Sequence, residues 1–153
     1  MAKTQDGRLL LTHFIKEESF TDDPPELERQ QVALDPPEAE ISQLLLDKEQ
    51  RNLYIVTSDG GLTHIDVSDK EDPQQVQKIH LVDEGLQVTN VQFLAGDISL
   101  LVGDSSGRVV QWFSVRDERG NEVLTPIRDF SLQKHEQNAA ISGIASEHSR
   151  KGF

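Results

Sequence analysis

Residues 52–67 read NLYIVTSDGGLTHIDV, and residues 99–115 read SLLVGDSSGRVVQWFSV. Each passage has an apolar run rich in β-forming residues, a polar turn that ends in glycine, and a second apolar run. The two turn glycines, Gly60 and Gly107, lie 47 residues apart. A strand–turn–strand unit that recurs with a period in the forties is typical of repeat proteins built from small β-sheets.

Two apolar residues spaced three apart precede each of these passages. Ile41-x-x-Leu44 and Val88-x-x-Val91 each begin 19 residues before the turn glycine, and Ile141-x-x-Ile144 begins 100 residues after the first. Residues 7–11 match residues 107–111 at the same offset of 100. We expect the chain to begin inside one repeat, to run through two whole repeats and to end inside a fourth.

This organisation predicts an all-β fold made of β-propeller blades, which are four-stranded antiparallel sheets. We expect a WD-like β-propeller fragment with two complete four-stranded blades plus partial blades at both ends. Residues 1–153 would then be a single fragment of a larger propeller domain. The whole repeats span about 26–69 and 73–118, and the partial repeats span 7–18 and 122–153.

Several segments have a predicted place in these blades. Residues 28–34 would be an outer strand, with a flexible linker as the alternative because paired prolines flank them. Residues 127–130 would be another outer strand. Residues 133–145 have helical propensity, but the repeat favours a loop followed by a strand over 141–145.

Glycines carry the predicted hairpin turns. Ser58-Asp59-Gly60-Gly61 links two strands, and glycine supplies a positive φ there at no steric cost. We assign Gly60, Gly61 and Gly107 to structural turns.

The composition excludes several classes of function. The 153 residues carry a net charge of −12 with a pI of about 4.7, which makes nucleic acid and anionic lipid poor partners. The absence of cysteine removes disulfides, thiolate catalysis and cysteine-ligated metals. No stretch reaches the ~20 apolar residues of a membrane helix, so direct membrane insertion of this fragment is not expected.

The sequence contains one short motif that is associated with catalysis. Residues 103–107 read GDSSG and match the G-x-S-x-G pattern of hydrolases, which requires a strand before the serine and a helix after it. A strand is predicted to follow, so we interpret the passage as a blade turn. His64 and Asp66 share one face of a strand and could form a metal pair, but surface or hydrogen-bonding roles are the simpler interpretation. The sequence therefore predicts no enzyme, no catalytic or metal residues and no cofactor.

Trp112 is the single tryptophan of the chain. It stands near the end of a predicted blade strand, beside Phe113. We expect it to pack between blades, and the alternative is an aromatic contact with a protein partner.

Four stretches suggest a family. Residues 107–117 (GRVVQWFSVRD) followed by 124–130 (LTPIRDF), together with 23–29 (DPPELER) and 147–153 (EHSRKGF), resemble the extracytoplasmic WD-like β-propeller region of long PstC-type phosphate ABC transporter permeases. The resemblance covers the chain from about residue 7 onward.

The resemblance implies a non-catalytic domain on the periplasmic face of the bacterial inner membrane, within a longer membrane protein. It implies a scaffold, docking or regulatory role in phosphate import, with transporter subunits or the phosphate-binding protein as partners. A generic WD-type protein-interaction propeller from an unrelated protein is the alternative, and a propeller hydrolase is a weaker one. Apolar residues at the innermost-strand positions count against the hydrolase.

The truncated repeats predict unpaired strand edges. Two whole blades cannot close a ring, and exposed edges invite the addition of another strand. We expect pairing of those edges within the chain or between two copies, which would give an open wedge or a homodimer.

Overall fold

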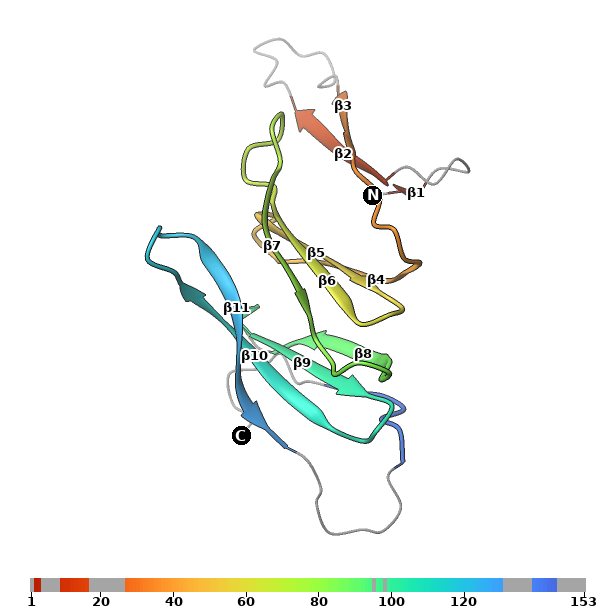
Figure 1. Ribbon diagram of the computed structural model, residues 1–153. Helices are drawn as coiled ribbons and strands as arrows, with labels where there is room; N and C mark the ends of the chain where they lie inside the picture. The colour runs from red at the N-terminus through yellow and green to blue at the C-terminus, as the bar shows by residue number, and fades with distance from the viewer. Residues whose placement is uncertain are drawn as a thin grey trace.

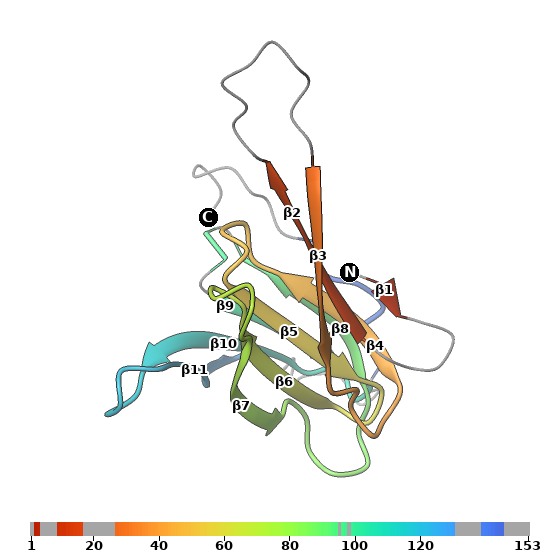
Figure 2. The ribbon, with the colours of Figure 1, turned by 90° about the horizontal axis from the view of Figure 1, so that it is seen from above.

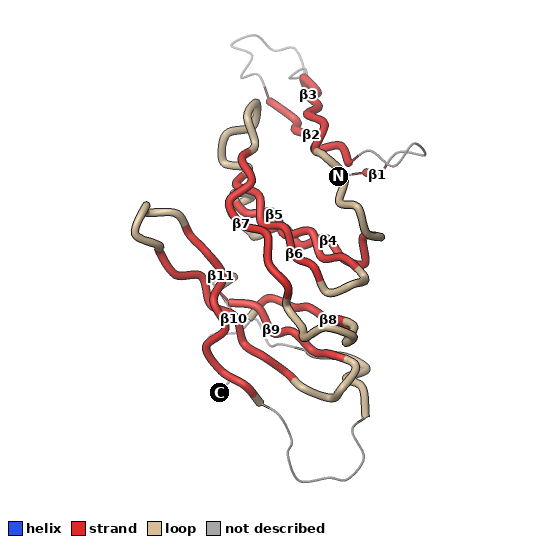
Figure 3. The backbone as a smooth tube through the Cα atoms, viewed as in Figure 1, coloured by secondary structure: helices blue, strands red, loops and turns tan. Residues whose placement is uncertain are grey.

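The computed structural model describes residues 2–3, 9–16, 27–94, 96–97, 99–130 and 139–145. These residues form eleven strands in three antiparallel sheets, with no helix among them (Figure 1, Figure 3). The all-β prediction is confirmed. The three sheets lie one above another as an open stack and do not close into a ring (Figure 1).

The sheets follow one another along the chain. The N-terminal sheet has the order β1-β2-β3, the middle sheet β4-β5-β6-β7, and the C-terminal sheet β8-β9-β10-β11. The strands are β1 (Ala2–Lys3), β2 (Leu9–Lys16), β3 (Leu27–Leu34), β4 (Ile41–Leu46), β5 (Asn52–Thr57), β6 (Gly61–Asp66), β7 (Gln74–His80), β8 (Val88–Phe93), β9 (Ser99–Asp104), β10 (Val109–Arg116) and β11 (Glu122–Asp129). Each sheet therefore ends with its outer strand, so a sequence repeat such as 26–69 begins with the outer strand of one sheet and ends with the third strand of the next.

The middle and C-terminal sheets share one strand register. Ile41 lies opposite Thr57 in the middle sheet, and Val88 lies opposite Asp104 in the C-terminal sheet, 47 residues later. Both sheets also have irregularities at equivalent places. The first falls between residues 41 and 43 and again between 88 and 90, and the second between 64 and 65 and again between 111 and 112. The repeat thus extends to the β-bulges, which locally bend and twist a sheet.

The N-terminal sheet follows the same plan. Lys3 pairs with Leu9, as Gly103 pairs with Val109 in the C-terminal sheet, at the offset of 100 seen in the sequence. β1 therefore occupies the second-strand position, and β2 and β3 occupy the third and fourth. Residues 27–34 form a strand paired with β2 over its whole length, so the linker interpretation is wrong.

The middle sheet is buried on both faces. Along β5, Leu53 and Ile55 belong to the core shared with the N-terminal sheet, while Tyr54 and Val56 belong to the core shared with the C-terminal sheet. All four side chains are at most 3% exposed. This explains why the sequence of β5 is an unbroken apolar run and not an alternating one.

Two glutamine side chains join the middle and C-terminal sheets. The Gln43 amide donates to the carbonyl oxygen of Val91 at 2.7 Å and accepts from the Val91 amide at 3.2 Å. The Gln77 amide makes the same pair of bonds with Leu124, at 3.0 and 2.8 Å. Gln43 lies on the first strand of its sheet and Gln77 on the last, so the two amides fasten the sheets along both edges. We call these contacts the glutamine clamps.

The predicted strand over 141–145 is not formed. Residues 139–145 have no regular secondary structure. The amide of Ile141 donates to the carbonyl oxygen of Asp104 at 3.1 Å. The described residues include no second strand for this segment to pair with. A lone first strand has no ladder partner, which is the physical reason for the difference.

Candidate functional site

The turn glycines lie where the sequence predicts them. Gly60 and Gly107 have φ angles of +88° and +87°, and the amide of each donates to the carbonyl oxygen three residues earlier. This is the three-residue hairpin loop in which a type I turn is followed by a left-handed residue. Gly61 begins β6 and has no positive φ. Gly60 is thus the residue whose backbone requires glycine, and Gly61 belongs to the strand.

An aspartate recurs at the start of these turns. The Asp104 carboxylate accepts from the amides of Ser106 and Arg108 and from the Ser106 hydroxyl, at 2.6–3.1 Å. Asp117 accepts from the amides two and four residues later in the same way, and Asp47 accepts from the amides four and five residues later. The aspartates satisfy backbone donors that the turn leaves unpaired, which is a structural role.

The G-x-S-x-G passage is one of these turns. It joins β9 to β10, and β10 is a strand. The Ser105 hydroxyl accepts from the amide of Gln87 at 3.1 Å. A nucleophile elbow needs a strand followed by a helix, so this arrangement does not present Ser105 as an elbow would.

His64 is buried in a chain of polar contacts on the middle sheet. It is 1% exposed, and its ring stacks on Tyr54 with centroids 4.6 Å apart. Its Nε2 lies 2.9 Å from Oδ1 of Asn52, whose amide nitrogen donates to Asp47 at 2.9 Å. Because the amide oxygen can only accept, Nε2 carries the proton and Nδ1 does not.

The surroundings keep His64 neutral. Burial lowers the pKa of His64 from 6.5 to about 4, against the raising effect of Asp66 and Asp47. Asp66 acts on His64 through its charge, and its carboxylate accepts a hydrogen bond from the Ser68 amide at 2.8 Å. His64 and Asp66, considered from the sequence as a metal pair, both line one pocket, but Nε2 of His64 is engaged by Asn52 and the ring packs on Tyr54.

A polar pocket of about 160 Å³ opens beside this chain of contacts. It lies between the middle sheet and the β10–β11 hairpin, and its lining residues are Arg51, Asn52, His64, Asp66, Val76, Arg116, Gly120, Asn121 and Glu122. Pockets for small molecules usually measure roughly 300–1,000 Å³ and are mostly apolar. The volume and lining therefore do not match a small-molecule site.

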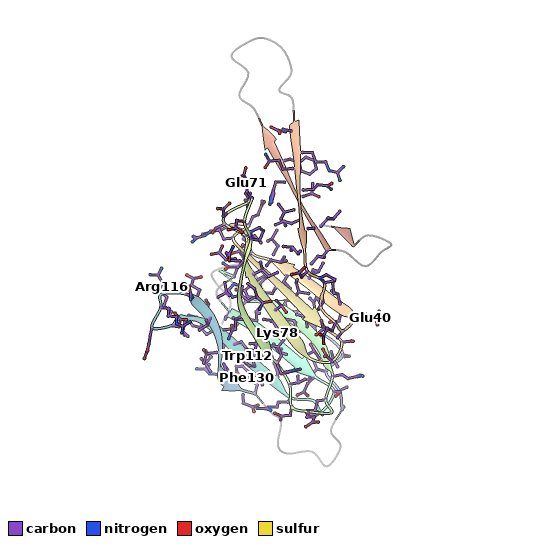
Figure 4. The ribbon with its side chains drawn as sticks, turned by 45° about the horizontal axis from the view of Figure 1, so that its top comes forward. Glu40, Glu71, Lys78, Trp112, Arg116 and Phe130 are labelled. Carbon is purple, nitrogen blue, oxygen red and sulfur yellow. The ribbon has the colours of Figure 1, made fainter. Side chains whose placement is uncertain are left out.

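Trp112 lies inside the core between the middle and C-terminal sheets. It is 8% exposed and belongs to the same cluster as Val56 and Leu100. Figure 4 shows it within the body of the C-terminal sheet, whereas Arg116 and Glu71 lie near the tips of projecting hairpins. A partner could reach only a small part of the indole.

Clusters of metal-binding side chains and membrane-spanning helices were also sought among the described residues. Across the described ranges there is no group of three or more His, Cys, Asp or Glu side chains that could hold a metal ion. Within the same ranges, no helix is long and apolar enough to cross a membrane. Residues 23–26 and 147–153, which contribute to the family resemblance, lie outside the described residues.

The residues that join the sheets could not be identified from the sequence. Gln43 lies inside the Ile41-x-x-Leu44 motif, but a glutamine there has no distinctive chemistry. Gln77 and Leu124 are separated by 47 residues, the repeat period, and that spacing is the one signal that could have linked them.

Comparison with known proteins adds no family. No protein-family model matches the chain, and no curated protein is significantly similar to it. The function is therefore argued from the stacked sheets themselves.

Proposed function

We propose that this chain is part of a WD-like β-propeller that serves as a non-catalytic scaffold or docking module. The observation that carries the proposal is the repeated interface between sheets. Sheets with the same register and the same bulges, 47 residues apart, stack face to face with glutamine clamps at both edges. A unit that can stack on its own copy in this way is what a propeller requires.

Support for a binding rather than a catalytic role comes from where the reactive groups lie. His64 and Asp104 are buried in turn and strand contacts, and the turn holding Ser105 lies between two strands. Acidic residues outnumber basic ones in the chain, 27 to 15, which gives the net charge of −12. A chain of this charge suits a basic protein partner better than an anion.

The resemblance to long PstC-type permeases gives the proposal a setting. In that setting the domain lies on the periplasmic side and contacts transporter subunits or the phosphate-binding protein. The phosphate itself would be handled elsewhere, because an acidic surface repels it.

Phosphate uptake by bacterial cells tests this setting. The longer protein that contains this chain would be expressed intact and with residues 27–130 deleted. We expect the deletion to lower the uptake of labelled phosphate at low binding-protein concentration, and expect excess binding protein to restore it. Equal uptake by the two proteins at every concentration would contradict a docking role. A parent protein without membrane helices would contradict the permease setting and favour a generic interaction module.

A further inference from the structure

Counting only described strands, the N-terminal sheet has three of the four strands of the plan. β1 pairs with β2 in the register of a second strand, and β2 and β3 are the third and fourth. Among the described residues no strand pairs with the other edge of β1. In the described part of the chain, the first-strand position of this sheet is therefore unfilled.

The segment 139–145 carries the sequence of a first strand but has no regular secondary structure. Ile141-x-x-Ile144 corresponds to Val88-x-x-Val91, the start of β8. Its position corresponds too. Val88 packs against the core that contains Val56, and the Ile141 side chain lies against Gly103, the residue 47 positions after Val56. Ile141 therefore packs against the C-terminal sheet at the place where Val88 packs against the middle sheet.

Two exposed leucines on β4 indicate where an additional strand would pack. Leu44 and Leu46 on β4 face the N-terminal sheet and are 38% and 43% exposed. Their equivalents on β8 are Val91, which is 1% exposed, and the half-buried Phe93. The difference arises because β4 lies over β8, whereas no described strand lies over β4 at the matching place.

A second observation concerns Asn90 on the opposite end of the stack. Asn90 is equivalent to Gln43, whose amide clamps the backbone of Val91. The side-chain oxygen of Asn90 is buried and has no hydrogen-bond partner. By the repeat, its partner would be the backbone of residue 144, once that residue lies in a strand. A buried amide oxygen without a partner costs free energy, which such a bond would recover.

One molecule cannot bring these two ends together. Residues 139–145 lie against the C-terminal sheet, and the N-terminal sheet lies on the far side of the middle sheet (Figure 1). Figure 2 looks along the stack, so the sheets overlap in it. A second copy, placed head to tail, can supply the strand to each N-terminal sheet.

We propose that two copies of this chain exchange residues 141–145 and close a ring of six four-stranded sheets. Each segment becomes the first strand of the other copy's N-terminal sheet, covers Leu44 and Leu46, and offers its backbone to Asn90 of its own chain. Six blades fall within the usual range of four to eight. The inference rests on the proposed propeller arrangement and adds the partner that completes it.

The repeat fixes the register of the exchanged strand. Val91 lies opposite Val102 in the C-terminal sheet, so Ile144 of one copy should lie opposite Ala2 of the other. Val91 turns its amide and carbonyl to Gln43, away from β9, so this is a non-hydrogen-bonded pair. The Cα atoms of such a pair are about 4.5 Å apart, within the range that a disulfide spans.

Engineered cysteines test that register, since the chain has none of its own. The double variant Ala2→Cys/Ile144→Cys should oxidise to a covalent dimer held by two disulfides. The matched control is Ala2→Cys/Ala145→Cys, which moves one cysteine to the opposite face of the strand. We expect at least a tenfold lower yield of covalent dimer from the control. Equal yields, or no dimer from either, would overturn the exchange.

The mass in solution provides an independent measurement. Light scattering on the unmodified protein should give about 34 kDa, twice the 17.2 kDa of one chain. Ile144→Lys should shift the mass to 17.2 kDa, whereas Ile127→Lys, on the peripheral strand β11, should not. A monomer, or a ladder of larger assemblies, would overturn the closed ring. If that monomer still shows a β-sheet circular dichroism spectrum, only the strand exchange is contradicted. A helical spectrum would contradict both the stacked-sheet fold and the strand exchange.

Discussion

At the scale of single residues, backbone geometry decides which positions matter. Gly107 and Gly120 have nearly the same φ, +87° and +85°, in turns of the same kind. A Cβ on Gly107 would lie 2.5 Å from the carbonyl oxygen of Ala139, but one on Gly120 would meet nothing within 4 Å. A comparison of substitutions at the two glycines therefore separates the free-energy cost of a left-handed backbone from that of a steric clash.

Alanine at each glycine measures that separation. Gly120→Ala should destabilise the fold by about 1–2 kcal/mol, the cost of an L-residue with a positive φ. Gly107→Ala should cost about 1–3 kcal/mol more, because the backbone of residue 139 has to move. Urea unfolding of both variants checks this. Equal losses of stability would show that Ala139 does not lie against this turn.

His64 predicts a specific response to acid. Its pKa is about 4 in the folded chain and about 6.5 when unfolded. Between these values the unfolded chain binds a proton that the folded chain does not, so stability falls as the pH drops from 6.5 toward 4. The total loss is roughly 3 kcal/mol. Asp66, whose lowered pKa starts from 3.8, adds its loss only at lower pH.

His64→Gln is the variant that isolates this effect. Glutamine occupies the equivalent position 111 in the C-terminal sheet, where its amide lies 3.4 Å from Ser99. We expect the variant to fold and to lose most of the stability change between pH 6.5 and 4, as followed by thermal unfolding. An unchanged pH profile would mean that His64 titrates freely in the folded protein.

At the scale of elements, the sequence predicts strands far better than it predicts how sheets join. The apolar runs and the glycine spacing mark the strands from β2 to β10, because a strand needs only local apolar patterning and a turn. The outer strand predicted over 127–130 covers only the end of β11 (Glu122–Asp129). The bulges between residues 88 and 90 and between 111 and 112 leave no local mark. The strand over 141–145 was predicted wrongly because a strand requires a neighbour, which local sequence does not report.

The glutamine clamps make a prediction at this scale. Gln43→Leu should leave the Val91 amide and carbonyl buried without partners, at about 1–3 kcal/mol for each group. Gln75→Leu, on the exposed side of β7, is the matched control and should change stability by less than about 0.5 kcal/mol. Chemical denaturation distinguishes the two. Similar effects would show that Gln43 does not fasten the sheets.

At the scale of the whole molecule, stability comes from stacking. The middle sheet contributes both of its faces to cores, while the N-terminal and C-terminal sheets each bury one principal face. A repeat unit with two apolar faces gains most when it has a neighbour on each side. This accounts for a chain that is polar overall, with a mean hydropathy of −0.50, yet has an unbroken apolar run in β5.

The central claim is that sheets of one plan stack through the glutamine clamps, and nuclear Overhauser effects test it most directly. The side-chain amide protons of Gln43 should show cross-peaks to the backbone amide of Val91, and those of Gln77 to the backbone amide of Leu124. A protein that shows the cross-strand contacts within each sheet but neither of these cross-peaks would contradict the account.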